Sequence, residues 1–470
     1  MTLGEIVAII GARPCDPALA EVEPTGFSID SRTIRPGELF FAITGTNKDG
    51  HDFVGDALQK GACAAVVGRD VSGVDLRRQI RVADPLVALQ GLAREVRRRW
   101  GKPVIGITGS SGKTMTKELT ALMLSADGAR VVKTVGNYNN AYGLPLSLLQ
   151  MISDGRTPAD YDYAVLEMGM SAPGEITHLC RIAQPTVGVV TNVGAAHLAF
   201  FPSVEAIAEA KAELVDNLPA DGLAILNADD PRVARMRWRQ PIAVRTFGIE
   251  SEADVRAREL RIHGLEGMSF QLITPRGQVE VRTSLLGRHQ VANIVAAAAV
   301  ADYFHIGLEA IARAVAHARP YTMRGEILRF PQHFVVIDDS YNSNPRALAE
   351  MVATVASVNG VARRIVVAGE MLELGEHSAE LHRQCGREIA RRGIDLLLGV
   401  RGDARELIAG AREAGMPEEA TRYVDTPEDA ARWLFDNVRS GDLVLVKGSR
   451  GVRLDQVVAR LKHVFMGEGT

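Results

Sequence analysis

Residues 104–114 have the sequence VIGITGSSGKT, in which a short apolar run leads directly into a glycine-rich turn that ends in Lys-Thr. The apolar run predicts a buried strand at Val104–Ile107, and a helix is predicted over Lys117–Ser125. Backbone N–H groups in such a turn can converge on phosphate oxygens, and the following helix adds its positive N-terminal end. The residues that would surround the phosphates are Gly109, Ser110, Ser111 and Gly112.

Two side chains at the end of the turn match the needs of a nucleoside triphosphate. Lys113 would reach the outer phosphates, and the hydroxyl of Thr114 would help to hold Mg²⁺. Ile107 stands where the usual motif has a glycine, so the loop has the form TGxxGKT. The alternative is a glycine turn with a chance Lys-Thr, but the order of strand, loop and helix favours a phosphate site. Kinases, motor ATPases and ligases share such a loop, so it predicts only nucleotide binding.

The composition is typical of a soluble globular protein. The chain has 470 residues, of which 46% are hydrophobic and 24% charged, with a formal net charge of −3. Domains usually hold about 100–200 residues, so we expect three. Without a basic excess, non-specific nucleic-acid binding is not expected. No apolar stretch reaches the roughly 18 residues of a membrane span. The cysteines lack CxxC spacing, and we see no signal peptide, so we expect a cytoplasmic protein.

Alternating apolar strands and helical patterns predict an α/β protein of three domains. Residues 1–83 would form a small N-terminal α/β domain with short strands such as Glu38–Ile43. Residues 84–318 would form a central ATP-binding domain of the P-loop type, with a mainly parallel sheet covered on both faces. Residues 319–470 would form a C-terminal Rossmann-like α/β domain. This last region has no GxGxxG loop, so we do not propose NAD.

Three residues of the central region are candidate metal ligands. Glu167 ends one predicted strand and His197 follows another, and ligand sites gather at the carboxyl ends of parallel strands. Lys211 lies on the apolar face of a predicted helix. A buried lysine has a lowered pKa, and its neutral amine can take up CO₂ to form a carbamate, an anionic oxygen ligand. The alternatives are a solvated glutamate, a structural histidine and a lysine whose ammonium reaches the edge of the core; helix position alone favours this last one.

Further motifs extend along the whole chain. In the central and C-terminal regions they are NYNN (137–140), LEMGM (166–170), TNVGAAHL (191–198), AEAK (208–211), NADD (227–230) and DDSYNSNP (338–345). Together with the glycine loop, they resemble the Mur ligases of peptidoglycan synthesis. Four other stretches are similar to the type that adds D-alanyl-D-alanine, namely DSR (30–32), DGHD (49–52), GEMLELG (369–375) and KGSRG (447–451).

The resemblance implies an ATP-dependent amide ligase that joins D-alanyl-D-alanine to UDP-N-acetylmuramoyl-tripeptide through an acyl phosphate. The N-terminal domain would bind the UDP-linked substrate, the central domain ATP and the C-terminal domain the dipeptide. The C-terminal domain would close before chemistry, and the protein would be a monomer. The resemblance also implies a pair of Mg²⁺ ions, one held by Thr114 and Glu167 and the other by His197 and carbamylated Lys211. Lys113, Lys211 and His197 would carry the catalysis.

The resemblance assigns further contacts. Those to the nucleotide would come from Asn293, Arg324 and Asp339. Those to the UDP-linked substrate would come from Ser31, Arg32, His51, Asn137, Asn139 and Asn140. For Ser31, Arg32 and His51 the alternative is ordinary loop polarity.

Two other functions remain open on the sequence. The first is another amide ligase, of Mur type or folylpolyglutamate type. A folylpolyglutamate-type ligase shares the ATP chemistry but needs no uridine site. The stretches at 30–32 and 49–52 argue against that type. The second is a nucleotide-binding scaffold without turnover. The joint presence of Lys113, Glu167 and Lys211 argues against a scaffold, because a degenerate relative would have lost at least one of them.

Overall fold

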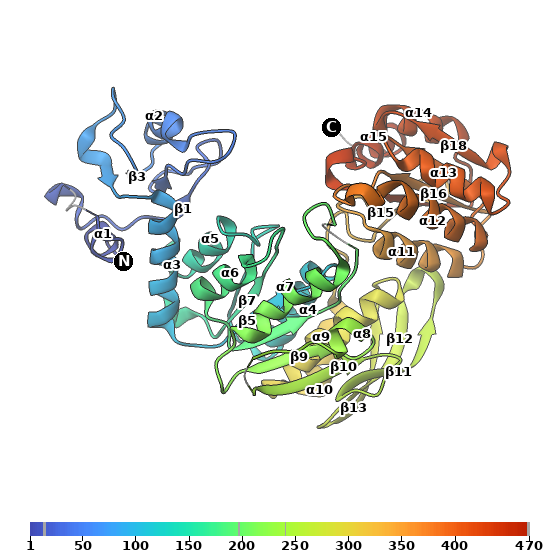
Figure 1. Ribbon diagram of the computed structural model, residues 1–470, viewed down its shortest axis with the longest axis horizontal. Helices are drawn as coiled ribbons and strands as arrows, with labels where there is room; N and C mark the ends of the chain where they lie inside the picture. The colour runs from blue at the N-terminus through green and yellow to red at the C-terminus, as the bar shows by residue number, and fades with distance from the viewer. Residues whose placement is uncertain (13–15, 196–197, 240, 468–470) are drawn as a thin grey trace.

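The computed structural model describes residues 1–12, 16–195, 198–239 and 241–467. Three separate sheets lie in three α/β domains, as predicted (Figure 1). The sheets span residues 27–81, 104–283 and 326–447, so each lies within one of the ranges predicted for a domain. Among the described residues, no helix has the length and apolar character needed to cross a membrane.

The N-terminal domain is built on a four-stranded parallel sheet in the order β1-β2-β3-β4. Its elements are α1 (Leu3–Ile9), β1 (Phe27–Ser28), β2 (Leu39–Phe41), α2 (Val54–Gln59), β3 (Ala64–Val67) and β4 (Gln79–Arg81). The long helix α3 (Pro85–Trp100) then leads into the middle domain. It begins where the Asp84 carboxylate accepts hydrogen bonds from the first-turn N–H groups, and it ends at Gly101 in the left-handed conformation.

The middle domain holds a nine-stranded sheet in the order β13-β12-β11-β10-β9-β8-β5-β7-β6. Its strands are β5 (Val104–Thr108), β6 (Val131–Lys133), β7 (Tyr163–Glu167), β8 (Val187–Val190), β9 (Leu223–Asn227), β10 (Ala243–Gly248), β11 (Val255–Ile262), β12 (Met268–Thr274) and β13 (Gly277–Thr283). Its helices are α4 (Lys113–Leu124), α5 (Gly143–Leu149), α6 (Glu175–Ala183), α7 (Val204–Asp216), α8 (Pro231–Ala234), α9 (Arg288–Tyr303) and α10 (Leu308–His317). The pairings of β11 with β12 and of β12 with β13 are antiparallel, and the other pairings in this sheet are parallel.

Helices cover both faces of the middle sheet, which confirms that prediction. Alternate residues of one strand point to opposite faces, so neighbours such as Leu166 and Val165 belong to different cores. One core packs α3, α5, α6 and α7 against the sheet and continues into the N-terminal domain. The other packs α4, α9 and α10. With both faces covered, binding groups are presented at the carboxyl ends of the strands.

The C-terminal domain has a six-stranded sheet in the order β14-β15-β19-β16-β17-β18, parallel except for the pairing of β14 with β15. Its strands are β14 (Glu326–Arg329), β15 (Val335–Asp339), β16 (Arg363–Gly369), β17 (Leu396–Val400), β18 (Thr421–Val424) and β19 (Asp442–Lys447). Its helices are α11 (Pro345–Ser357), α12 (Ser378–Arg391), α13 (Ala404–Glu413), α14 (Pro427–Asn437) and α15 (Asp455–Met466). Figure 1 places α11 on the side of this domain that faces the middle domain.

Candidate functional site

The glycine loop joins β5 to α4 at the centre of the middle sheet. Gly112 adopts a left-handed conformation with φ 81°, and a Cβ at this position would overlap the Asn293 side chain. A glycine here therefore allows both the turn and the close approach of α9. Helix α4 begins at Lys113, directly after the loop, so its first N–H groups and positive end face the loop. This geometry suits the binding of phosphate groups.

A neighbouring segment, Thr191–Gly194 at the end of β8, holds the loop in shape. The Asn192 side-chain oxygen accepts hydrogen bonds from the backbone N–H and hydroxyl of Ser111, at 3.0 and 3.1 Å. The Thr191 hydroxyl donates to the Ser111 carbonyl at 2.6 Å, and the Gly194 N–H donates to the Ser110 hydroxyl at 2.9 Å. The loop is thus fixed before any ligand arrives.

Lys113 points back across the loop that it follows. Its ammonium donates to the Gly109 carbonyl at 2.7 Å. Burial lowers the pKa of Lys113; the Glu167 carboxylate acts in the opposite direction and Arg324 in the same direction. The ammonium is therefore short of compensating negative charge, which phosphate oxygens would supply.

Glu167 lies at the end of β7 with its carboxylate buried beside the loop. One oxygen accepts from the Thr114 hydroxyl and the other from the Asn139 amide, each at 2.8 Å. The structure therefore brings Thr114 and Glu167 together, and their joint role as ligands of one Mg²⁺ ion stays a prediction. A hydroxyl oxygen next to a carboxylate is the donor set that Mg²⁺ prefers, so these residues fit the ion.

Lys211 projects from α7 into the same cavity. Its side chain is only 2% exposed, so its ammonium does not reach solvent as the alternative for this lysine requires. Burial lowers the pKa of Lys211 well below its usual value, and the nearby charge of Lys113 lowers it further. A buried amine with a lowered pKa meets the chemical requirement for carbamate formation.

His197, the other predicted ligand, lies outside the described residues, so its role stays a prediction. Among the described residues, no group of three His, Cys, Asp or Glu side chains is arranged to hold a metal ion. A metal site here would therefore depend on Thr114 and Glu167, together with a modified Lys211 or groups from the substrates.

The cavity next to the loop has a volume of about 800 Å³ and is lined by both the middle and the C-terminal domain. On the α9 side, Asn293 is buried and its amide donates to the Gln290 side chain at 3.1 Å. The Thr116 hydroxyl donates to the Asn293 oxygen at 3.3 Å. Asn293 thus lies directly behind the phosphate loop, where a base attached to the bound phosphates could reach it.

The C-terminal domain contributes charged groups to the same cavity. Arg324, in the linker before β14, lies over the Tyr341 ring with its guanidinium carbon 4.0 Å from the ring centroid. Its buried Nε has no hydrogen-bond partner among the described residues. Lys447, at the end of β19, donates to the Asp339 carboxylate at 2.5 Å and to the Asn342 carbonyl at 2.9 Å. Arg324 and Asp339 both line the cavity, as the nucleotide assignment requires.

The predicted asparagines of residues 137–140 line the cavity beyond Glu167. Asn139 holds the Glu167 carboxylate, as described above. The Asn140 side chain instead accepts hydrogen bonds from the Tyr142 and Gly143 N–H groups, at 3.1 and 3.0 Å, and so shapes the start of α5. Contact of these asparagines with the UDP-linked substrate stays a prediction.

The three N-terminal candidates lie in loops of the first domain. Ser31 is buried, whereas Arg32 is exposed and binds Asp30, whose pKa it lowers to about 2. His51 is buried with one ring nitrogen 2.6 Å from the Asp49 carboxylate, while the other accepts the Gly68 N–H at 2.8 Å. These bonds make His51 a brace for its loop, and a uridine contact from any of the three stays a prediction.

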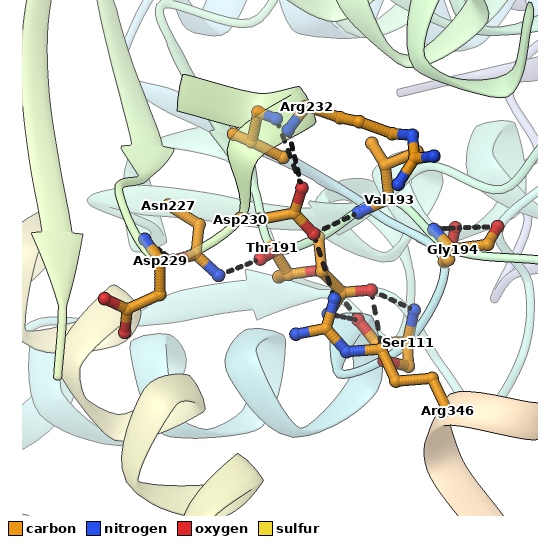
Figure 2. A network of polar contacts seen from close by, with 12 residues as sticks. Ser111, Thr191, Val193, Gly194, Asn227, Asp229, Asp230, Arg232 and Arg346 are labelled. Carbon is orange, nitrogen blue, oxygen red and sulfur yellow. Dashed lines mark hydrogen bonds and ion pairs between the residues drawn. The ribbon is translucent and has the colours of Figure 1, made fainter. Parts of the chain in front are cut away.

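Several residues of the site were given no role from the sequence, although all but Arg346 lie within the motifs quoted above. Asn192 and Thr191 brace the phosphate loop, and Lys447 binds Asp339. Asp230 binds Arg346 of the C-terminal domain, a contact that Figure 2 shows. Asn192 lies in the motif TNVGAAHL and Asp230 in the motif NADD, which is the signal that could have selected them. Arg346 carries no such signal, because its partner is 116 residues away in the chain.

Comparison with known proteins identifies all three domains. Residues 23–97 match the Mur ligase family catalytic domain, residues 107–301 the Mur ligase middle domain, and residues 323–450 the Mur ligase glutamate ligase domain.

Whole-chain relatives agree with these matches. UDP-N-acetylmuramoyl-tripeptide–D-alanyl-D-alanine ligase from Bacillus subtilis is 32% identical over 98% of both chains. The Escherichia coli ligase of the same name is 35% identical over 94% of this chain and 95% of its own. The crystal structure of MurF ligase from Thermotoga maritima in complex with ADP superposes with a TM-score of 0.80 at 31% identity, covering 94% of this chain and 98% of that one.

Proposed function

The chain belongs to the Mur ligase family, and we propose that it joins D-alanyl-D-alanine to UDP-N-acetylmuramoyl-tripeptide at the expense of ATP, in peptidoglycan precursor synthesis. The cavity at the phosphate loop is the observation that carries this proposal. It combines Lys113, Glu167 and Lys211 of the middle domain with Asp339 and Lys447 of the C-terminal domain. A phosphate site and a second substrate domain therefore share one enclosed space.

The chemistry explains why ATP is needed. A carboxylate is a poor electrophile, so amide formation from it is uphill in water. The terminal carboxylate of the tripeptide attacks the γ-phosphate, which forms an acyl phosphate and releases ADP. The free amine of D-alanyl-D-alanine then attacks the acyl carbon; the amide bond forms, phosphate leaves and the amine loses a proton. Two anions meet in the first step, so charge neutralisation and positioning should dominate catalysis.

Residues of this chain supply that neutralisation. Lys113 leaves the Gly109 carbonyl to bind the outer phosphates, and Arg324 offers its unpartnered Nε from the linker. The backbone of the loop binds the inner phosphates, in the shape that Asn192 holds. Asn293 would contact the base. Closure of the C-terminal domain over the cavity would limit the access of water and so protect the acyl phosphate from hydrolysis.

The donor set fits Mg²⁺, which would neutralise phosphate charge and polarise the bond to be broken. Thr114 and Glu167 would hold one ion. Carbamylated Lys211, with His197, would hold a second. Asn139 then orients the Glu167 carboxylate toward the cavity through its hydrogen bond.

We further propose that the N-terminal domain holds the UDP-linked substrate and that the enzyme works as a cytoplasmic monomer. Both substrates are small, charged and water-soluble, as an enzyme that works in the cytoplasm requires.

A panel of incoming substrates tests the proposed specificity. Purified protein would be given ATP, Mg²⁺ and UDP-N-acetylmuramoyl-tripeptide, with D-alanyl-D-alanine, L-alanyl-L-alanine, D-glutamate or diaminopimelate as the amine. Mass spectrometry should find an amide product with D-alanyl-D-alanine and little with the others. A product formed preferentially with a single amino acid would instead assign the chain to another ligase type.

A further inference from the structure

One ion pair links the C-terminal domain to the part of the middle domain that braces the phosphate loop. Arg346, in the first turn of α11, donates to the Asp230 carboxylate at 2.9 Å (Figure 2). Asp230 follows β9 in the middle domain and is 2% exposed, whereas Arg346 is 40% exposed. The arginine therefore reaches from a half-exposed helix end into a buried pocket of the neighbouring domain.

The Asp230 carboxylate has its hydrogen-bonding capacity fully used. One oxygen accepts the Arg232 N–H at 3.0 Å and the Val233 N–H at 3.3 Å, which caps α8. The other accepts the Val193 N–H at 3.0 Å as well as Arg346. Because Val193 lies between Asn192 and Gly194, which hold Ser111 and Ser110, Arg346 is separated from the phosphate loop by one carboxylate and one short backbone segment.

Arg346 is itself held in place for this contact. Its Nε donates to Glu350, one turn further along α11, at 3.1 Å. Burial lowers the pKa of Arg346, but the Glu350 and Asp230 carboxylates more than offset this and raise the pKa overall, so the guanidinium stays charged. A charged fork fixed on one side by its own helix is poised to bind the other domain.

We propose that Arg346 is a positioning residue that couples docking of the C-terminal domain to the shape of the phosphate loop. When the C-terminal domain is docked, Arg346 binds Asp230, and Asp230 holds residues 191–194 against Ser110 and Ser111. When the domain swings away, Asp230 loses this partner and residues 191–194 lose part of their support. Nucleotide thus binds more tightly to the docked form, and by linkage bound nucleotide favours docking. This inference deepens the proposed function and rests on it for the binding of a nucleotide at the phosphate loop. It does not rest on which substrates are ligated.

The chain provides a matched control. Arg329 of β14 binds Glu266 of the middle domain at 2.9 Å, so it also forms an ion pair between the two domains. Glu266 follows β11 and lies next to neither the phosphate loop nor residues 191–194. Arg329→Met removes an ion pair between the two domains without touching the segment that braces the phosphate loop, so it controls for a general loss of contact between the domains.

The test measures ADP affinity of the full chain by calorimetry, in the presence of Mg²⁺, for wild type, Arg346→Met, Arg346→Lys and Arg329→Met. Arg346→Met should raise the ADP dissociation constant about tenfold, or ~1.4 kcal/mol. Arg346→Lys keeps the charge but not the forked guanidinium, so its ADP dissociation constant should lie between those of Arg346→Met and wild type. The ADP dissociation constant of Arg329→Met should stay within about twofold of that of wild type, because Glu266 contacts neither the phosphate loop nor residues 191–194.

Three outcomes would overturn the proposal: wild-type ADP affinity in Arg346→Met, equal losses in Arg346→Met and Arg329→Met, or no recovery in Arg346→Lys. Circular dichroism and thermal unfolding without nucleotide separate coupling from damage to the fold, since Arg346→Met should keep the wild-type spectrum and a single cooperative transition, and the loss of either would count against coupling. ADP binding does not depend on the identity of the substrates. If wild type binds ADP but does not ligate D-alanyl-D-alanine, the proposed function fails while the coupling is still tested.

Discussion

Two lysines buried in the middle domain should respond in opposite ways to the same substitution. Lys211 is 2% exposed and Lys117 is fully buried at 0%. Lys117 donates to the Thr134 carbonyl at 2.9 Å and lies 2.7 Å from the Glu118 carboxylate. Lys211 instead lies beside the like charge of Lys113, and burial lowers its pKa well below the usual value. Lys211→Met should stabilise the folded protein, and Lys117→Met should destabilise it.

The expected sizes follow from these surroundings. Replacing a buried ion pair with apolar residues of similar volume is neutral or stabilises a protein by about 1–4 kcal/mol, and we expect Lys211→Met, which removes a buried ammonium beside a like charge, to stabilise by an amount in this range. Lys117→Met removes hydrogen bonds of a charged group, each of which contributes about 1.5–3 kcal/mol. The Lys211 effect also depends on pH. Because its folded-state pKa is lowered, the cost of the ammonium is fully present below that pKa and vanishes as the pH rises toward the usual 10.5.

Denaturant unfolding in CO₂-free buffer without magnesium measures both effects, because carbamate formation and metal binding are then absent. The free energy of unfolding should rise for Lys211→Met at pH 7, and this gain should shrink as the pH approaches 10. The free energy of unfolding should fall for Lys117→Met both at pH 7 and near pH 10. If Lys211→Met destabilised the protein as much as Lys117→Met, the Lys211 amine would be favourably bound in the interior, and the reasoning from its desolvation would be refuted.

Other substitutions test the site directly. Lys113→Met should lower ligation at least about a hundredfold, measured as product formed under conditions where circular dichroism is unchanged. Glu167→Gln should raise the Mg²⁺ concentration needed for half-maximal activity, and chelation of the metal should abolish activity reversibly. Lys211→Ala should lose ligation, and added short carboxylic acids should restore part of it by replacing the carbamate. Asn293→Ala should raise the KM for ATP several-fold, because it removes a contact at the base side of the loop.

Local signals in the chain predicted most of the fold. An Asp-Pro pair is typical of a helix start, and α3 begins at Asp84-Pro85 with Asp84 as its cap. The strand before the glycine loop was predicted at Val104–Ile107, and β5 ends one residue later at Thr108, because a short apolar run before a turn has few other structures available. The start of α4 was predicted four residues late, at Lys117 instead of Lys113. The first helical turn directly follows the loop glycine at 112, so its residues were assigned to the loop.

Long-range features were harder to predict. The antiparallel edge β11–β13 carries polar residues on its exposed face and gives no apolar run, so it was not identified. The contact of Glu167 with Thr114 spans 53 residues; the place of Glu167 at a strand end indicated only that it lies near the ligand site, and the resemblance joined it to Thr114. The contact of Arg346 with Asp230 joins two domains, and nothing near either residue in the sequence indicates the other.

The most direct test of the account is phosphate release from ATP in three mixtures, containing D-alanyl-D-alanine alone, UDP-N-acetylmuramoyl-tripeptide alone, or both. The tripeptide would be supplied with either lysine or diaminopimelate as its third residue. Sustained phosphate release should require both substrates, because turnover needs the carboxylate to be phosphorylated and the dipeptide amine to consume the acyl phosphate. Release that is independent of the dipeptide, or none with either tripeptide, would contradict the proposed ligase.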